Sequence, residues 1–306
     1  MNPDTKKPKL SLSLSLSPSF GITDSPGSIE DKLRTSFNLL NNKMFSYVNN
    51  PQLKELMSEI MESCVSSLGK SFTCIGRPIV LKSNNGIVTN DFFIGDDNYH
   101  AKITSVYVYA CGEYVYKRSS FFINDTNCFF KLILEICLQN YANKLNCNLK
   151  VPAIYDYVLL QNNDYLSIEI KMERIKMLED YGDIQSEILK SHSYLINKIQ
   201  NGLKCFENNG LYHNDTHTDN IGFYRDSDTR GIQVAVMDFG KATLTNKNRY
   251  QSTSGFYEEL HKKKEFEQWF SRAILPIFWG KKIYGGRKRR TSKAPRKKHK
   301  NTYRRK

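Results

Sequence analysis

The sequence predicts an α+β fold in which a β-rich lobe with one long helix precedes a helical lobe that holds a β-hairpin. Three observations support this. Residues 71–119 are rich in strand-forming residues, and residues 127–145 form a long apolar helical pattern. A strongly periodic helix over 184–206 is then followed by two short β-rich runs. With 306 residues, 40% of them hydrophobic, the chain is long enough to bury a substantial core.

The first 27 residues are punctuated by proline, serine and glycine, which predicts a disordered leader. Leucine and serine alternate over residues 10–17, a pattern that suits a short strand-forming segment better than the core of a signal peptide. A basic stretch precedes this run, so a signal peptide remains the alternative.

Two helices are expected next, as an N-terminal extension over residues 28–70. Ser28 is suited to cap the first helix, and Pro51 suits the first turn of the second. Apolar residues recur at helical spacing in both, which indicates packing faces: Leu33, Phe37, Leu40, Met44 and Val48 in the first, and Leu53, Leu56, Ile60, Cys64 and Leu68 in the second.

The strand candidates of the β-rich lobe form two hairpins on either side of the long helix. Residues 105–110 and 114–117 flank the turn Cys111–Glu113, and residues 153–160 and 165–172 flank a turn at Asn162 and Asn163. In the second lobe the periodic helix ends near Gly210. A hairpin of 221–223 and 232–236 follows, and residues 256–278 are expected to form a last helix.

The net charge of +14 is concentrated in one segment. Residues 281–306 contain fourteen Lys or Arg and no acidic residue, so the remaining chain carries 31 basic against 31 acidic residues. This excludes a uniformly basic nucleic-acid binder. The tail is expected to be disordered and to attract nucleic acid or another acidic partner. The alternatives are that it is a nuclear localisation signal or that it only keeps the chain well solvated. No apolar run is long enough for a transmembrane helix, and no membrane partner is expected.

The seven cysteines are odd in number and contain no Cys-x-x-Cys pair. This pattern suggests neither a disulfide framework nor a zinc site, and it favours free cysteines in a reducing, intracellular compartment.

Two short motifs carry the chemistry. The first, His213-Asn-Asp-Thr-His-Thr-Asp-Asn220, places a carboxylate and an amide on one loop. The second, Asp238-Phe-Gly240, follows the last hairpin and adds another carboxylate. Transfer of the γ-phosphoryl group of ATP needs such groups, because a carboxylate must orient the attacking hydroxyl and oxygen ligands must hold Mg²⁺ on the phosphates.

In these motifs the sequence resembles the protein-kinase-like superfamily. The resemblance implies that Asp215 is the catalytic base, that Asn220 and Asp238 are Mg²⁺ ligands, and that His213 braces the loop. His217, two residues after the base, makes the loop more similar to compact atypical kinases and aminoglycoside phosphotransferases. His217 either contacts phosphates or substrate, or is an ordinary hydrogen-bonded loop residue.

The resemblance further requires a strand lysine for the phosphates and a helical glutamate that holds it. Lys117 ends a β-rich segment, and Glu135 is the one acidic residue in an apolar helical run, so these two are predicted to pair. The alternative is that Glu135 is a solvated helix charge that pairs with Lys131 four residues earlier.

The end of the second hairpin resembles the segment between the two lobes of a kinase. Glu173 and Ile175 would contact the adenine of ATP there through backbone groups, or they would be ordinary residues at a strand end. The glycine-rich loop of the family is nearly absent, because the segment 93–100 keeps only Gly95 beside two aspartates. Gly95 is the candidate phosphate contact, with a plain turn residue as the alternative.

The second departure is length. Only about forty residues separate Gly240 from the basic tail, without an Ala-Pro-Glu signature, so the C-terminal lobe is expected to be reduced. The kinase-like domain is predicted to span residues 71–280, with lobes of 71–175 and 176–280, ahead of the tail 281–306.

The predicted function is an ATP- and Mg²⁺-dependent phosphotransferase acting on a hydroxyl, namely a serine/threonine protein kinase of an atypical compact type. The alternatives are a small-molecule kinase and an inactive pseudokinase scaffold. The basic tail after Gly285-Gly286 resembles, in composition alone, tails on proteins of large DNA viruses, so a virion or nuclear location is a further expectation.

Overall fold

The structure is a computed structural model that describes residues 28–175, 191–216, 220–227 and 230–244. The predicted leader, His217, the helix over 256–278 and the basic tail lie outside the described residues. The described helices are α1 (Ile29–Tyr47), α2 (Pro51–Ser66), α3 (Thr126–Lys144), α5 (His192–Asn208) and the short 3-10 turn η2 (Phe239–Lys241). The strands are β1 (Ile79–Ile94), β2 (Asp97–Cys111), β3 (Tyr114–Phe122), β4 (Ile154–Asn162), β5 (Tyr165–Glu173), β6 (Ile221–Arg225) and β7 (Ile232–Val236). The fold is therefore α+β, as predicted.

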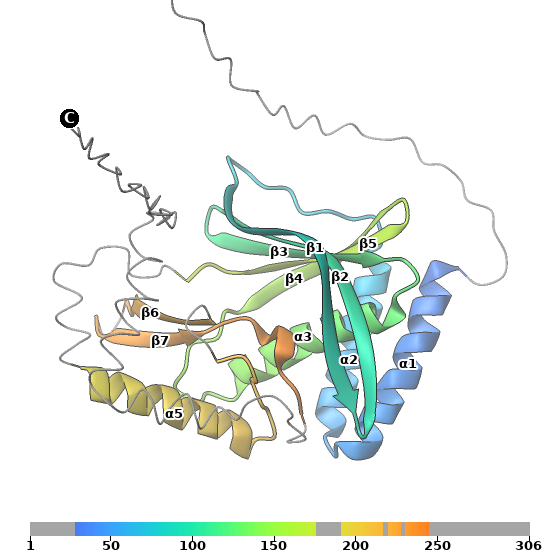
Figure 1. The fold of residues 1–306 in the computed structure, drawn as a ribbon. Coiled ribbons are helices and arrows are strands. Elements are labelled where there is room, and N and C mark those ends of the chain that lie inside the picture. The colour runs from blue at the N-terminus through green and yellow to red at the C-terminus, as the bar shows by residue number, and fades with distance from the viewer. Residues whose placement is uncertain (1–27, 176–190, 217–219, 228–229, 245–306) are drawn as a thin grey trace, which may run out of the picture.

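The larger sheet has five antiparallel strands in the order β1-β2-β3-β5-β4. Both predicted hairpins are present, and the turn at Gly112 has the positive φ that glycine adopts without strain. The strands β1 and β2 are much longer than the β-rich runs suggested, and they form a ribbon that projects from the sheet (Figure 1). Most of β1 is exposed, because it is the edge strand of that sheet.

The helix α3 lies against one face of the sheet, with α1 and α2 beyond it (Figure 1). Ser28 caps α1 in a capping box with Asp31, and Pro51 opens α2, as the sequence predicts. Phe37 of α1 contacts the rings of Phe129 and Phe130 of α3. The predicted N-terminal extension therefore shares its core with the sheet and with α3.

The second sheet is the hairpin of β6 and β7, which packs beside α5 (Figure 1). The predicted apolar face of α5 is buried through Leu195, Ile199, Leu203 and Phe206. Lys150, on the segment between α3 and β4, exchanges backbone hydrogen bonds with Val234 and Val236 of β7. This connection fixes the hairpin against the chain that carries the larger sheet, and one apolar core runs through both parts.

The expectation that all cysteines are free is wrong for four of the seven. Cys74 pairs with Cys111, and Cys147 pairs with Cys205, while Cys64, Cys128 and Cys137 carry buried free thiols. The paired residues are 37 and 58 positions apart in sequence, yet their Cα atoms lie 5.9 and 5.6 Å apart. Only the tertiary fold determines such distances, so neither the odd number nor the spacing of cysteines was a sound guide. The prediction of a reducing compartment was based on free cysteines, so it is no longer supported by the cysteine pattern and stays a prediction.

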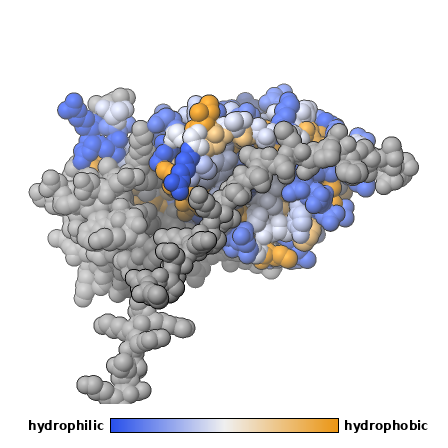
Figure 2. Space-filling view, turned by 90° about the horizontal axis from the view of Figure 1, so that it is seen from above, coloured by the Kyte–Doolittle hydropathy of each residue, from blue (hydrophilic) through white to orange (hydrophobic). Residues whose placement is uncertain are grey.

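The surface above the larger sheet is mixed in character. Figure 2 shows small apolar groups scattered among hydrophilic residues on the visible part of this face. Across the described part of the chain, no helix combines the length and the apolar character needed to cross a membrane.

Candidate active site

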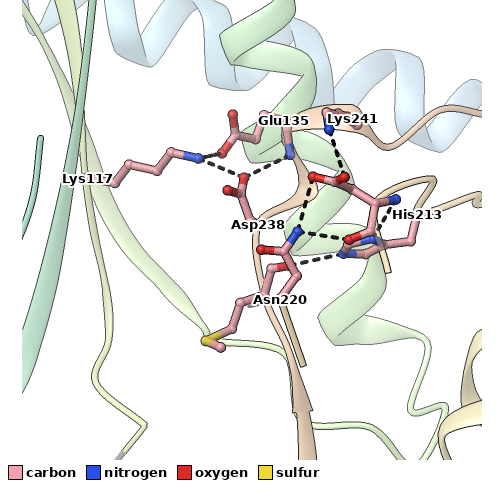
Figure 3. A network of polar contacts seen from close by, with 9 residues as sticks. Lys117, Glu135, His213, Asn220, Asp238 and Lys241 are labelled. Carbon is pink, nitrogen blue, oxygen red and sulfur yellow. Dashed lines mark hydrogen bonds and ion pairs between the residues drawn. The ribbon is translucent and has the colours of Figure 1, made fainter. Parts of the chain in front are cut away.

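The two predicted motifs and the predicted lysine–glutamate pair come together in one polar cluster (Figure 3). Lys117 of β3 donates to Glu135 of α3 at 2.6 Å and to Asp238 at 3.0 Å. Glu135 is 5% exposed, so its carboxylate depends on Lys117 for compensation of its charge. The sequence prediction that these two residues pair is confirmed, and the alternative of a solvated Glu135 is wrong.

Charge coupling in this trio fixes the protonation states. Burial alone would lower the pKa of Lys117, but the carboxylates of Glu135 and Asp238 outweigh burial and raise it. Lys117 in turn holds the pKa of Asp238 well below its usual range, against the effect of burial. The lysine is therefore a fixed cation and Asp238 a fixed anion across the physiological pH range.

Lys131, the alternative partner of Glu135, is buried one turn away on α3. Its Nζ lies 3.5 Å from the backbone oxygen of Ala242 and 5.9 Å from the centre of the Phe92 ring. Burial lowers the pKa of Lys131 from 10.5 to about 8, although Glu135 acts in the opposite direction. The positive charge of this amine is poorly compensated, because Glu135 forms its ion pair with Lys117 instead.

We expect Lys131→Met to stabilise the protein at pH 7. Below pH 8 the buried amine is charged and costs stability. Between pH 8 and about 10 the folded protein binds fewer protons than the unfolded chain, so the free energy of unfolding rises with pH. The substitution should raise that free energy at pH 7 by about 2 to 3 kcal/mol and remove the rise above pH 8. Urea denaturation at pH 7, 8 and 9.5 measures the free energy of unfolding at pH 7 and its rise with pH. The control is Lys144→Met, which removes an exposed lysine from the same helix. An unchanged rise in the Lys131 variant would contradict this assignment.

The loop that carries Asp215 is braced by His213, as the resemblance implied. Because the backbone oxygen of Met237 can only accept, the Nε2 of His213 donates to it at 3.1 Å, and Nδ1 accepts from the backbone N–H of Asp215. The His213 ring also packs edge-on against buried Phe239. Thus the histidine connects the first motif to the second and has a structural role.

Both carboxylate oxygens of Asp215 are oriented by neighbouring side chains. Oδ2 accepts from Asn220 Nδ2 at 3.1 Å, and Oδ1 accepts from Lys241 Nζ at 2.7 Å (Figure 3). Met237 N donates to the backbone oxygen of Asn220, so the loop and the segment before Asp238 are joined directly. This geometry brings Asp215, Asn220 and Asp238 into one site, as the sequence predicts.

The glycine of the second motif is closely packed against two acidic side chains of the site. A Cβ on Gly240 would lie 3.1 Å from Asp238 Oδ1 and 3.4 Å from Glu135 Oε2. The backbone N–H of Gly240 donates to Asp238 Oδ1 at 3.3 Å. Asp238 itself adopts a left-handed conformation, with φ of 60°, which turns its side chain toward Lys117.

Gly95 is not brought to this cluster. It lies in the turn between β1 and β2, and a Cβ there would approach the Tyr47 ring of α1 to 2.4 Å. In the same turn Asp97 pairs with Lys43 of α1. Val108, which lies opposite Lys117, is eleven residues along β2 from Asp97, or up to roughly 35 Å of extended strand. The glycine is thus explained by packing against α1 and by its φ of 62°.

The adenine candidates lie at the end of β5. Ile170 is opposite Lys117, so Glu173 is three residues away along β5, or roughly 10 Å. The Glu173 carboxylate accepts from Lys150 at 2.7 Å and from Ala153 N at 3.2 Å, which ties its side chain to the segment before β4. Ile175 is partly buried just beyond the strand. Any contact of these residues with a base would therefore be made by backbone groups or by Ile175.

Two lysines of this region were not found by sequence reasoning. Lys241 directly follows the second motif, and its position after Gly240 was the available signal. Lys82 of β1 lies on the same face of the sheet as Lys117, but nothing in the local sequence distinguishes it from other strand lysines.

The donor set fits Mg²⁺, although it is small. Asp238 and Asn220 offer a carboxylate and an amide, and Mg²⁺ is commonly held by one or two protein oxygens together with substrate phosphates. Asp238 Oδ1 is engaged by Lys117 and Gly240, while Oδ2 makes no hydrogen bond with any described residue. Within the described ranges, no group of three or more His, Cys, Asp and Glu side chains is placed to hold a metal by itself.

Comparison of the whole chain with protein-family models found no match, and comparison with curated proteins found none either. A function is therefore inferred from the geometry of the site and from the resemblance of its motifs.

Proposed function

We propose that the protein is a kinase-like phosphotransferase that moves the γ-phosphoryl group of ATP to a hydroxyl group. The observation that carries this proposal is the ion-paired trio of Lys117, Glu135 and Asp238, joined through the segment before Asp238 to the pair of Asp215 and Asn220. A strand lysine held by a helical glutamate, beside a metal-binding aspartate, is the arrangement that phosphoryl transfer in protein kinases requires. By this proposal the described residues form a two-lobed kinase-like fold.

The register of the sheet supports one orientation of the bound nucleotide, with the adenine near the end of β5 and the phosphates near Lys117. Cross-strand partners share one face of a sheet, so Ile79, Ala110, Val115 and Met172 form an apolar row nearest the end of β5. The next row on this face contains Lys82, Val108, Lys117 and Ile170. The two rows are about 7 Å apart. An adenine base suits the apolar row beside Glu173 and Ile175, and the phosphates suit the row with the lysines.

In the proposed reaction Asp215 orients the acceptor hydroxyl. The hydroxyl oxygen forms a bond to the γ-phosphorus, the bond between that phosphorus and the β,γ-bridging oxygen breaks, and ADP leaves. The hydroxyl proton passes to the Asp215 carboxylate, whose orientation Asn220 and Lys241 maintain. Lys241 also places a cation where the transferring group carries negative charge.

When bound, Mg²⁺ would neutralise charge on the phosphates and hold them in line for transfer. Asp238 and Asn220 would hold it. The fixed negative charge of Asp238 serves this role, since Lys117 keeps its pKa low and the residue ionised.

The acceptor proposed is serine or threonine on a protein, with a small-molecule alcohol as the second possibility. The basic segment 281–306 is proposed to bind a polyanion such as nucleic acid, through an interaction that weakens steeply with salt. An intracellular location, in the nucleus or a virion, belongs to the same proposal.

The proposal is tested by transfer of labelled γ-phosphate from Mg·ATP to the protein itself and to a generic basic substrate. We expect transfer by the wild type and a loss of about 10²- to 10⁴-fold in Asp215→Asn. The amide is nearly isosteric and can still accept from Lys241, while Asn220 loses its side-chain acceptor but keeps the backbone oxygen of residue 215. The melting temperature of the variant should therefore fall only slightly, and its affinity for Mg·ATP should be kept.

Equal transfer by both proteins would remove Asp215 from the reaction. Binding of Mg·ATP without transfer by the wild type would favour a pseudokinase scaffold. Failure to bind any nucleotide would overturn the proposal.

A further inference from the structure

Among the residues that the structure describes, no glycine-rich loop lies beside Lys117 to enclose the phosphates of a nucleotide. The β1–β2 turn holds Gly95 and two aspartates, and it packs against α1 rather than near Lys117. Lys117 is itself shared between Glu135 and Asp238, so much of its charge is already compensated. A bound triphosphate carries several negative charges, so a further cation beside Lys117, Lys241 and Mg²⁺ would strengthen its binding.

Lys82 of β1 is placed to supply this cation. Lys82 lies opposite Val108 of β2, and Val108 lies opposite Lys117 of β3, so all three side chains project from one face of the sheet. That face is the one toward Glu135 and Asp238, because Lys117 reaches both. Two strand spacings separate the Cα atoms of the lysines by about 10 Å, a span that two lysine side chains and a polyphosphate together can bridge.

The surroundings of Lys82 leave its amine available. The residue is exposed, and its side chain forms no ion pair or hydrogen bond with any described residue. Lys102 is an exposed lysine of the same ribbon, but it lies between buried Ala101 and Ile103 and so projects from the opposite face.

We propose that Lys82 binds the β- and γ-phosphates of the nucleotide and takes the place of a glycine-rich loop. The proposal rests on the nucleotide-binding function proposed above. A side-chain cation on an edge strand replaces backbone N–H groups as the phosphate ligand, so the site needs no close backbone approach and no run of glycines.

The test compares the affinities of wild type, Lys82→Ala, Lys82→Arg and Lys102→Ala for Mg·ATP, Mg·ADP and adenosine by calorimetry. We expect Lys82→Ala to bind Mg·ATP about 10-fold more weakly, since one charge-assisted contact is lost. The loss should be smaller for Mg·ADP and absent for adenosine. Lys82→Arg should keep most of the affinity, and Lys102→Ala should match the wild type.

If Lys82 binds phosphate, the loss of affinity in Lys82→Ala should increase with the number of phosphates on the ligand. If Lys82 has only a structural role, the substitution should weaken the binding of all three ligands equally. Unchanged affinity of Lys82→Ala for Mg·ATP, or an equal loss for adenosine, would overturn the proposal for Lys82 alone. A wild type that binds none of the three ligands would overturn the proposed function, and Lys82 with it.

Discussion

Replacing Asp238 with asparagine should abolish Mg²⁺-dependent nucleotide binding and reduce phosphoryl transfer by about 10³-fold or more. The carboxylate of Asp238 is the fixed negative charge at the proposed metal site, and asparagine removes that charge while keeping nearly the same shape. Lys117 keeps Glu135 as its partner at 2.6 Å, so the buried lysine remains paired and the fold should survive.

The measurement is the shift in melting temperature caused by ATP with and without Mg²⁺, together with the transfer assay. Asp164→Asn, at the exposed turn between β4 and β5, is the matched control and should behave as the wild type. Equal Mg·ATP-induced shifts in Asp238→Asn and the wild type would remove Asp238 from the site.

Replacing Lys117 with methionine should destabilise the protein by about 3 to 5 kcal/mol, because it leaves a buried carboxylate without its cation. Glu135 bears most of this cost, since its side chain is 6% exposed whereas that of Asp238 is 36% exposed and can be solvated. The double variant Lys117→Met/Glu135→Leu should recover much of the lost stability, because the stranded charge is then gone and apolar groups fill the space. Neither variant should transfer phosphate.

Urea denaturation of the wild type, both single variants and the double variant closes a double-mutant cycle. The exposed Lys102→Met substitution is the control for removing a strand lysine. Additive effects of the two single substitutions would contradict a coupled pair, and they would make the 2.6 Å contact energetically unimportant.

Much of the fold was readable from the sequence because its signals are local. The capped start of α1, the proline that opens α2, the hairpin turn at Gly112 and the apolar face of α5 each depend on residues a few positions apart. The full lengths of β1 and β2 were not predicted. Many residues of β1 face solvent on an edge strand, so no alternation of apolar and polar residues marks it.

The residues of the candidate site also fall into those that local sequence patterns identify and those that only the tertiary structure locates. Asp215, Asn220 and Asp238 belong to two short motifs, and Glu135 was identifiable as a lone acid in an apolar helix, so the sequence alone determined these residues and the partner Lys117. The positions of Gly95 and Lys82, the contact of Lys241 with Asp215, and the two disulfides were decided only by the tertiary structure. Each depends on the distance between residues far apart in the chain, or on which face of a strand a side chain occupies after a β-bulge, and local residue patterns do not encode either quantity.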